Sequence, residues 1–136
     1  MSFLVDTDVL SLLERKRVPP KLASWLAQHP ADLFVSVVSF AELEHGLRQA
    51  PVTHRPDLLA WLKETRQKFA PVIEPLTEPV LVRWKELLSD LKARNRTMTC
   101  EDSLIAATAL FYGHTVATHN RKHFEPAGVE VLDPLA

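Results

Sequence analysis

Short apolar segments alternate with longer amphipathic segments along the whole chain, and this order restricts the possible folds more than any other feature. The apolar segments predict buried strands at residues 3–5, 33–37, 72–76, 115–118 and 129–132. Strands that alternate with helices form a parallel sheet with helices on both faces. We therefore expect the α/β class, with a central parallel sheet.

The segments between the strands have the periodicity and the end signals of helices. Helices are expected at residues 8–16, 19–29, 39–50, 56–70, 77–95 and 100–113. The helix at 77–95 places Val80, Trp84, Leu87, Leu88 and Leu91 on one face. The helix at 100–113 is apolar on nearly all sides, which indicates burial, and Gly113 suits its C-terminal cap.

Composition excludes several classes of protein. A chain of 136 residues that is 46% hydrophobic suits one domain, residues 1–136, with one sizeable core. A net charge of −1 means that any nucleic acid must be held by local basic patches.

With Gly at only 3 positions there is no glycine-rich loop for a nucleotide. Cys100, the single cysteine, is expected to be a small buried packing residue. We find no signal peptide and no membrane span, so we expect a cytoplasmic protein without membrane contact.

Three acids stand where the fold would bring them together. Asp6 follows the first strand, Glu42 lies one turn into the helix after the second, and Asp102 lies one turn into the helix before the fourth. Sites in parallel α/β folds lie beyond the carboxyl ends of the strands, at the point where the strand order reverses. Each acid also has a structural interpretation. Asp6 can cap the first helix, and Ser39 with Glu42 or Thr99 with Asp102 has the spacing of a capping box.

The three acids together favour a metal site. Carboxylates within a few ångströms of one another repel, unless one holds a proton or a cation lies between them. Oxygen ligands suit Mg²⁺ or Mn²⁺. An ion held in this way can lower the pKa of bound water and neutralise charge that builds on a phosphodiester, so the pattern fits metal-dependent hydrolysis.

Four segments, "FLVDTDVL", "SVVSFAELEHGL", "EDSLIAATAL" and "VATHNRKHF", resemble in order and spacing a PIN-domain ribonuclease, specifically a VapC-type toxin. The resemblance covers essentially the whole chain. It implies a three-layer α/β/α sandwich and an endoribonuclease that uses Mg²⁺ or Mn²⁺ held by Asp6, Glu42 and Asp102. It also implies a VapB-like antitoxin that covers the crevice, and a homodimer formed through apolar helix faces. The RNA target cannot be inferred, since it depends on loop shape and RNA structure.

This sequence departs from the family in the loop after the fourth strand. Members carry a further acid there, whereas this loop reads "THNRKHF". Asn120 and His123 stand where the aspartate is expected. Asn120, Thr7 and Thr118 are candidates to complete the coordination of the ion or to hold the acids in place. Basic residues that could bind RNA phosphates are Arg94, Arg96, Arg121 and Lys122.

Three alternatives remain open. His119 and His123 have the spacing of zinc ligands, although no second pair accompanies them. "DTDVL" also resembles the start of haloacid-dehalogenase-type phosphatases, but the lysine and late acidic pair which that chemistry needs are missing. The domain could instead be a PIN fold without catalysis that binds RNA or a protein partner.

Overall fold

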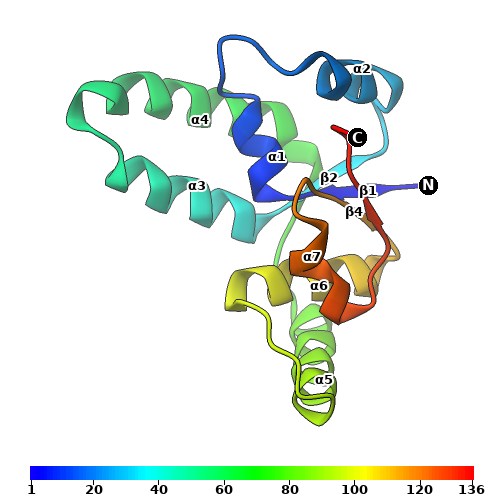
Figure 1. Cartoon of the computed structure of the whole chain (residues 1–136). Coiled ribbons are helices and arrows are strands. Elements are labelled where there is room, and N and C mark those ends of the chain that lie inside the picture. The colour runs from blue at the N-terminus through cyan, green and yellow to red at the C-terminus, as the bar shows by residue number, and fades with distance from the viewer.

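The computed structural model describes residues 1–136 and contains a central sheet of five parallel strands (Figure 1). The strands are β1 (Phe3–Val5), β2 (Leu33–Ser36), β3 (Ile73–Glu74), β4 (Thr115–Ala117) and β5 (Val131–Leu132). They lie in the order β3-β2-β1-β4-β5, and every neighbouring pair is parallel. The predicted strands and their parallel arrangement are confirmed.

Helices cover both faces of this sheet. They are α1 (Thr7–Leu12), α2 (Pro20–Gln28), α3 (Val37–Gln49), α4 (Arg55–Phe69), α5 (Glu78–Ala93), α6 (Cys100–Tyr112) and α7 (Arg121–Phe124), with short 3-10 turns at Val52–His54, Ala70–Val72 and Glu125–Ala127. Successive side chains of a strand point to opposite faces. Phe3 and Val5 accordingly pack with α1, α2 and α4, whereas Leu4 packs with α5 and α6. The expected three-layer sandwich is confirmed.

Some boundaries differ from those expected. The third helix begins at Val37, not at Ser39, because the Ser36 hydroxyl accepts a hydrogen bond from the Val38 amide over 3.1 Å and caps the helix directly at the strand end. The first helix ends at Leu12, before the exposed basic residues 15–17, which have no apolar surface to bury.

The two ends of α6 give one correction and one confirmation. Cys100 is exposed, not buried, since it is the first residue of α6 and lies outside the packed face. Gly113 caps α6 in the left-handed conformation with φ 76°, as predicted.

The order of the strands defines where a site can form. The chain leaves β1 towards β2 on one side, and β4 lies on the other side of β1, so the topology reverses between β1 and β4. The Asp6 amide donates a hydrogen bond to the Ala117 carbonyl over 2.9 Å and joins the carboxyl ends of these two strands. Residues that follow β1 and β4 are therefore held side by side. No helix of this fold combines the length and the apolar character that crossing a bilayer requires.

Candidate metal centre

Asp6 lies at this reversal point and is only 5% exposed. One carboxylate oxygen accepts a hydrogen bond from the Thr7 amide over 2.8 Å, which caps α1. The other oxygen accepts one from the Thr118 hydroxyl over 2.8 Å. The capping interpretation of Asp6 is confirmed, and the same geometry holds its carboxylate where β1 and β4 end.

The surroundings of Asp6 oppose its ionisation. Burial is the main cause, and the neighbouring Asp8 carboxylate adds to it, so the pKa of Asp6 rises from 3.8 to about 8 although Thr118 and the Thr7 amide favour the charged form. A carboxyl group in this state binds a proton at neutral pH unless a cation is present. A cation in the crevice would remove that penalty.

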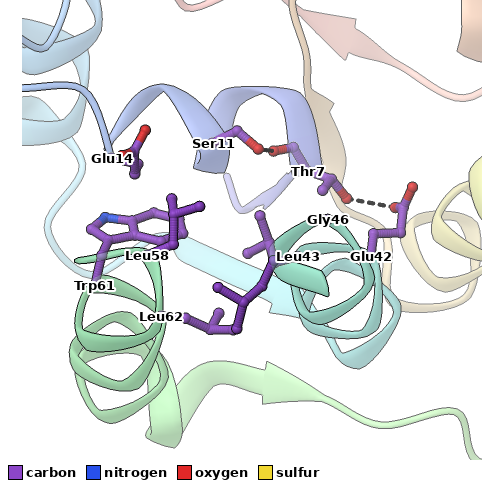
Figure 2. A pocket seen from close by; sticks show the side chains of 10 residues that line it. Thr7, Ser11, Glu14, Glu42, Leu43, Gly46, Leu58, Trp61 and Leu62 are labelled. Atoms are coloured by element: carbon purple, nitrogen blue, oxygen red, sulfur yellow. Dashed lines mark hydrogen bonds between the residues drawn. The ribbon is translucent and has the colours of Figure 1, made fainter. Parts of the chain in front are cut away.

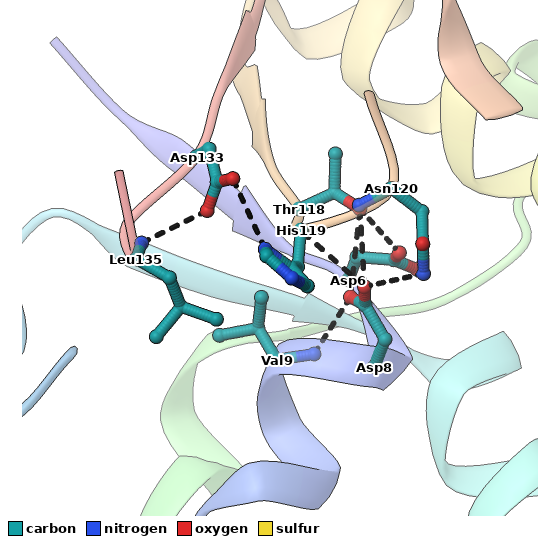
Figure 3. A network of polar contacts seen from close by, with 8 residues as sticks. All are labelled: Asp6, Asp8, Val9, Thr118, His119, Asn120, Asp133 and Leu135. Atoms are coloured by element: carbon teal, nitrogen blue, oxygen red, sulfur yellow. Dashed lines mark hydrogen bonds and ion pairs between the residues drawn. The ribbon is translucent and has the colours of Figure 1, made fainter. Parts of the chain in front are cut away.

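Asp8 belongs to the same network, and sequence reasoning did not include it among the site residues (Figure 3). Its carboxylate accepts hydrogen bonds from the Asn120 side chain over 2.7 Å and from the His119 amide over 3.2 Å. It also lies 3.5 Å from the Thr118 hydroxyl. The signal that could have identified it is the D-x-D spacing, which puts both carboxylates in the first turn after a buried strand.

Glu42 lies on α3 and contacts the first residue of α1. Its carboxylate accepts a hydrogen bond from the Thr7 hydroxyl over 2.7 Å, and the Ser39 hydroxyl lies 2.8 Å from the same threonine oxygen. The capping-box interpretation of Ser39 and Glu42 is therefore wrong, because Ser36 caps the helix and Ser39 is fully buried inside it. Burial raises the pKa of Glu42, and the charges of Asp102, Glu101 and Asp8 add to this effect against the opposing bond from Thr7.

Asp102 approaches from the start of α6. The Thr99 hydroxyl accepts a hydrogen bond from the Asp102 amide over 3.1 Å, so Thr99 is the cap that its spacing predicted. The Asp102 carboxylate lies 3.6 Å from His123 Nδ1. Burial raises the pKa of Asp102, and Glu101 and Asp8 raise it further, while Thr99 and His123 lower it. Glu42 and Asp102 therefore lie within electrostatic range of each other and of Asp8.

These acids fit an open magnesium or manganese site rather than a closed cage. No three His, Cys, Asp or Glu side chains are close enough to enclose a bare ion. Mg²⁺ in proteins usually keeps several waters and binds through only one or two carboxylates. Carboxylate oxygens near the poorly solvated Asp6 are ligands of the kind that such a hydrated ion prefers, and they supply the negative charge that it needs.

The polar side chains of the loop after β4 contact different acids. Asn120 donates to Asp8, and His123 lies against Asp102. His119 Nδ1 lies 3.1 Å from Asp133. The two histidines therefore contact separate acids and are not arranged as a pair of zinc ligands.

The four basic residues proposed for RNA binding occupy different positions. Arg94 is already engaged, because its guanidinium donates to Asp90 over 2.7 Å and to the Pro126 carbonyl over 2.5 Å. Arg96 and Arg121 are exposed. Lys122 lines a pocket that Asp102 and His123 also line, so it lies near Asp102.

An apolar groove begins beside Glu42 (Figure 2). It has a volume of about 330 Å³ and lies between α1, α3 and α4. Thr7 and Glu42 lie at one end, and Leu43, Leu58 and Trp61 are among the apolar side chains along it. The groove thus offers apolar surface directly next to the acidic crevice.

The family model of the PIN domain matches residues 3–129. The chain belongs to the PIN-domain family. This membership confirms the resemblance drawn from the four sequence segments, and it rejects the haloacid-dehalogenase alternative.

Relatives of this PIN-domain chain match over nearly its full length. Plasmid stability protein StbB of Pseudomonas syringae is 33% identical, with 96% of each chain covered. VapC ribonuclease Y4jK of Sinorhizobium fredii is 28% identical, also with 96% of each covered. The crystal structure of FitAcB from Neisseria gonorrhoeae superimposes with a TM-score of 0.86 at 30% identity and covers 97% of both chains. Further structures of this fold are described as FitAB or VapBC, several of them bound to DNA.

Proposed function

We propose that this PIN domain is a VapC-like endoribonuclease that hydrolyses RNA phosphodiester bonds with the help of Mg²⁺ or Mn²⁺. The proposal rests mainly on the environment of Asp6. Its carboxyl group is almost fully buried where β1 and β4 end, and the Asp8 carboxylate is its neighbour. Relatives of similar length are named ribonucleases, which supports RNA as the substrate. Such an enzyme would act in the cytoplasm, where RNA is available.

The acids of the site would bind the ion, and the two threonines would orient the acids. Asp6, Glu42 and Asp102 would hold the ion, in part through its bound waters, and the ion when bound would supply positive charge to the phosphodiester and lower the pKa of water. Thr118 fixes one oxygen of Asp6, and Thr7 fixes one oxygen of Glu42. These hydrogen bonds hold the two carboxylates in a defined orientation before an ion binds. Catalysis would depend on this positioning and on electrostatic stabilisation of the transition state.

We also propose that an antitoxin covers the crevice. The apolar groove ends at Thr7 and Glu42, so a segment that filled it would lie against the acids. FitAB and VapBC structures share this fold, which supports a partner of this kind. Co-expression with a cognate VapB-like antitoxin tests it: the pair should copurify, and a charged residue in place of Leu58 should separate them.

Homodimerisation is a further proposal. The sequence offers the long helix with Trp84 and Leu88 as a dimer surface, with a core role as the alternative. Trp84 favours the core role, because its indole nitrogen donates to Ser103 over 2.8 Å and its ring packs against the core. Apolar side chains that remain exposed on α5 and α6 include Val82, Phe111 and Tyr112. We expect these to form the contact, and light scattering of Phe111→Ser beside the wild type measures it.

Cleavage of cellular RNA after brief induction tests the proposed activity. Sequencing of RNA ends should show new cuts with the wild type and none with Asp6→Asn. The purified protein should lose cleavage in a chelator and regain it with Mg²⁺ or Mn²⁺. Tight RNA binding without any metal-dependent cleavage would instead support the non-catalytic module.

A further inference from the structure

A second pocket, lined mainly by polar residues, lies beside Asp102. It has a volume of about 420 Å³, which lies in the range of roughly 300–1,000 Å³ typical of small-molecule sites. The loop between α5 and α6 forms one wall with Thr97, Met98 and Thr99. The short helix α7 forms the opposite wall with Lys122 and His123. Asp102 is part of the lining, so the pocket is continuous with the metal centre.

The chemistry of this pocket matches one nucleotide of a single strand. Lys122 is exposed and supplies a positive charge for a phosphate. The Thr99 oxygen already accepts the Asp102 amide, which leaves the hydroxyl hydrogen for an acceptor such as a ribose oxygen. Met98 is the one apolar residue of the lining, is half-buried, and packs on the core beneath it. A polarizable thioether held in this way suits contact with the face of a base.

The walls of the pocket are held before any ligand arrives. Arg94, at the end of α5, donates to the Pro126 carbonyl on the opposite wall and to Asp90 on its own helix. The Arg96 amide donates to the Leu91 carbonyl over 2.9 Å, which fixes the start of the loop. A preformed pocket binds its ligand without the entropic cost of ordering its walls. Arg94 is therefore a positioning residue and does not itself contact RNA.

We propose that this pocket is the subsite for the nucleotide next to the scissile phosphate of an RNA strand. This inference rests on the proposed ribonuclease function and adds the place where the substrate is held. With the scissile phosphate at Asp6 and Asp102, the strand would continue past His123. Lys122 would meet the neighbouring phosphate, and Met98 would meet the base.

Binding of a labelled single-stranded oligoribonucleotide of mixed sequence tests the subsite, by fluorescence anisotropy in the Asp6→Asn background. Lys122→Ala should weaken binding several-fold and lower the slope of log affinity against log salt by about 0.7, the value for one lost phosphate contact on a single strand. Met98→Ala should weaken binding with no change of slope. Lys63→Ala removes an exposed lysine from α4 and is the matched control, with affinity unchanged.

The outcomes separate this proposal from the proposed function. An unchanged affinity in either Lys122→Ala or Met98→Ala, or an equal loss in Lys63→Ala, overturns the subsite. In the Asp6-intact enzyme, Lys122→Ala should raise KM for RNA cleavage while kcat stays nearly constant. A wild type that cleaves no RNA in Mg²⁺ overturns the ribonuclease proposal, whereas the binding comparison still decides the subsite.

Discussion

The Thr118 hydroxyl donates a hydrogen bond to Asp6 over 2.8 Å and joins two residues that are 112 positions apart in the sequence. Thr118 is fully buried and also lies 3.5 Å from Asp8. The hydroxyl of the residue that follows β4 thus orients the acid that follows β1. The proposed metal centre would depend on this contact between the segments that follow the two strands as well as on the acids themselves.

Replacement of Thr118 should weaken metal binding without unfolding the protein. Thr118→Val keeps the shape of the side chain but removes the hydrogen bond that favours the charged form of Asp6. Loss of a group that orients a metal ligand typically costs about 10–100-fold in affinity, and we expect a loss of this size for Mn²⁺ by calorimetry. Thr118→Ser retains the hydroxyl and is the control. Equal affinities in Val and Ser variants would show that the contact has no role in binding.

The metal-free protein should become less stable as the pH rises from about 4 to about 8. Asp6 has its ordinary pKa of 3.8 in the unfolded chain and about 8 in the folded one, so the folded state holds an extra proton between these values. Stability falls with rising pH wherever the folded state binds more protons. Glu42 and Asp102 act in the same direction.

Urea unfolding in a chelator at several pH values measures this effect. Asp6→Asn cannot ionise and should lose stability less steeply than the wild type over that window. The two proteins should converge towards pH 4. Parallel curves for both proteins would contradict the assigned state of Asp6.

Mg²⁺ should stabilise the wild type against heat. An ion that binds only the folded state adds about 2.7 kcal/mol at a hundredfold excess over its Kd. For a chain of this size, that corresponds to a rise in Tm of roughly 5–15 °C. Asp6→Asn should show a much smaller rise, whereas Asp57→Asn, an exposed acid on α4, should respond as the wild type does. Equal shifts in all three proteins would place the ion elsewhere.

The loop after β4 predicts one ion in the resting protein. Asn120 is neutral and is bonded to Asp8, and His123 is a poor magnesium ligand beside Asp102. A two-ion clamp needs more negative charge to offset the repulsion between its ions. Calorimetric titration without RNA should therefore show one site in the wild type and tighter binding of a second ion in His123→Asp, since His123 is the residue that faces Asp102. Two tight sites in the wild type would contradict this expectation.

The sequence predicted the elements whose patterns are local, and it missed features that depend on packing. Alternating apolar and amphipathic segments were sufficient to predict the parallel sheet, and the end of the first strand was sufficient to place Asp6 where β1 and β4 end. The metal site formed by Asp6, Glu42 and Asp102 stays a prediction. The start of α3 was misplaced because both Ser36 and Ser39 have the side chain of a cap, and only burial distinguishes them. Asp8 was missed because its partners on the β4 loop are more than a hundred positions away.

Cleavage assays on paired acid variants test the central claim most directly. Purified wild-type protein, Asp6→Asn, Asp102→Asn and Asp57→Asn are incubated with total RNA in Mg²⁺, and folding of each is checked by circular dichroism. We predict that Asp6→Asn and Asp102→Asn fold normally and lose more than about a hundredfold in cleavage rate, comparable to the loss of a main electrostatic contact in other enzymes. Asp57→Asn should cleave as the wild type does, and a chelator should stop it. Substantial cleavage by folded Asp6→Asn or Asp102→Asn would contradict the assignment of the metal centre.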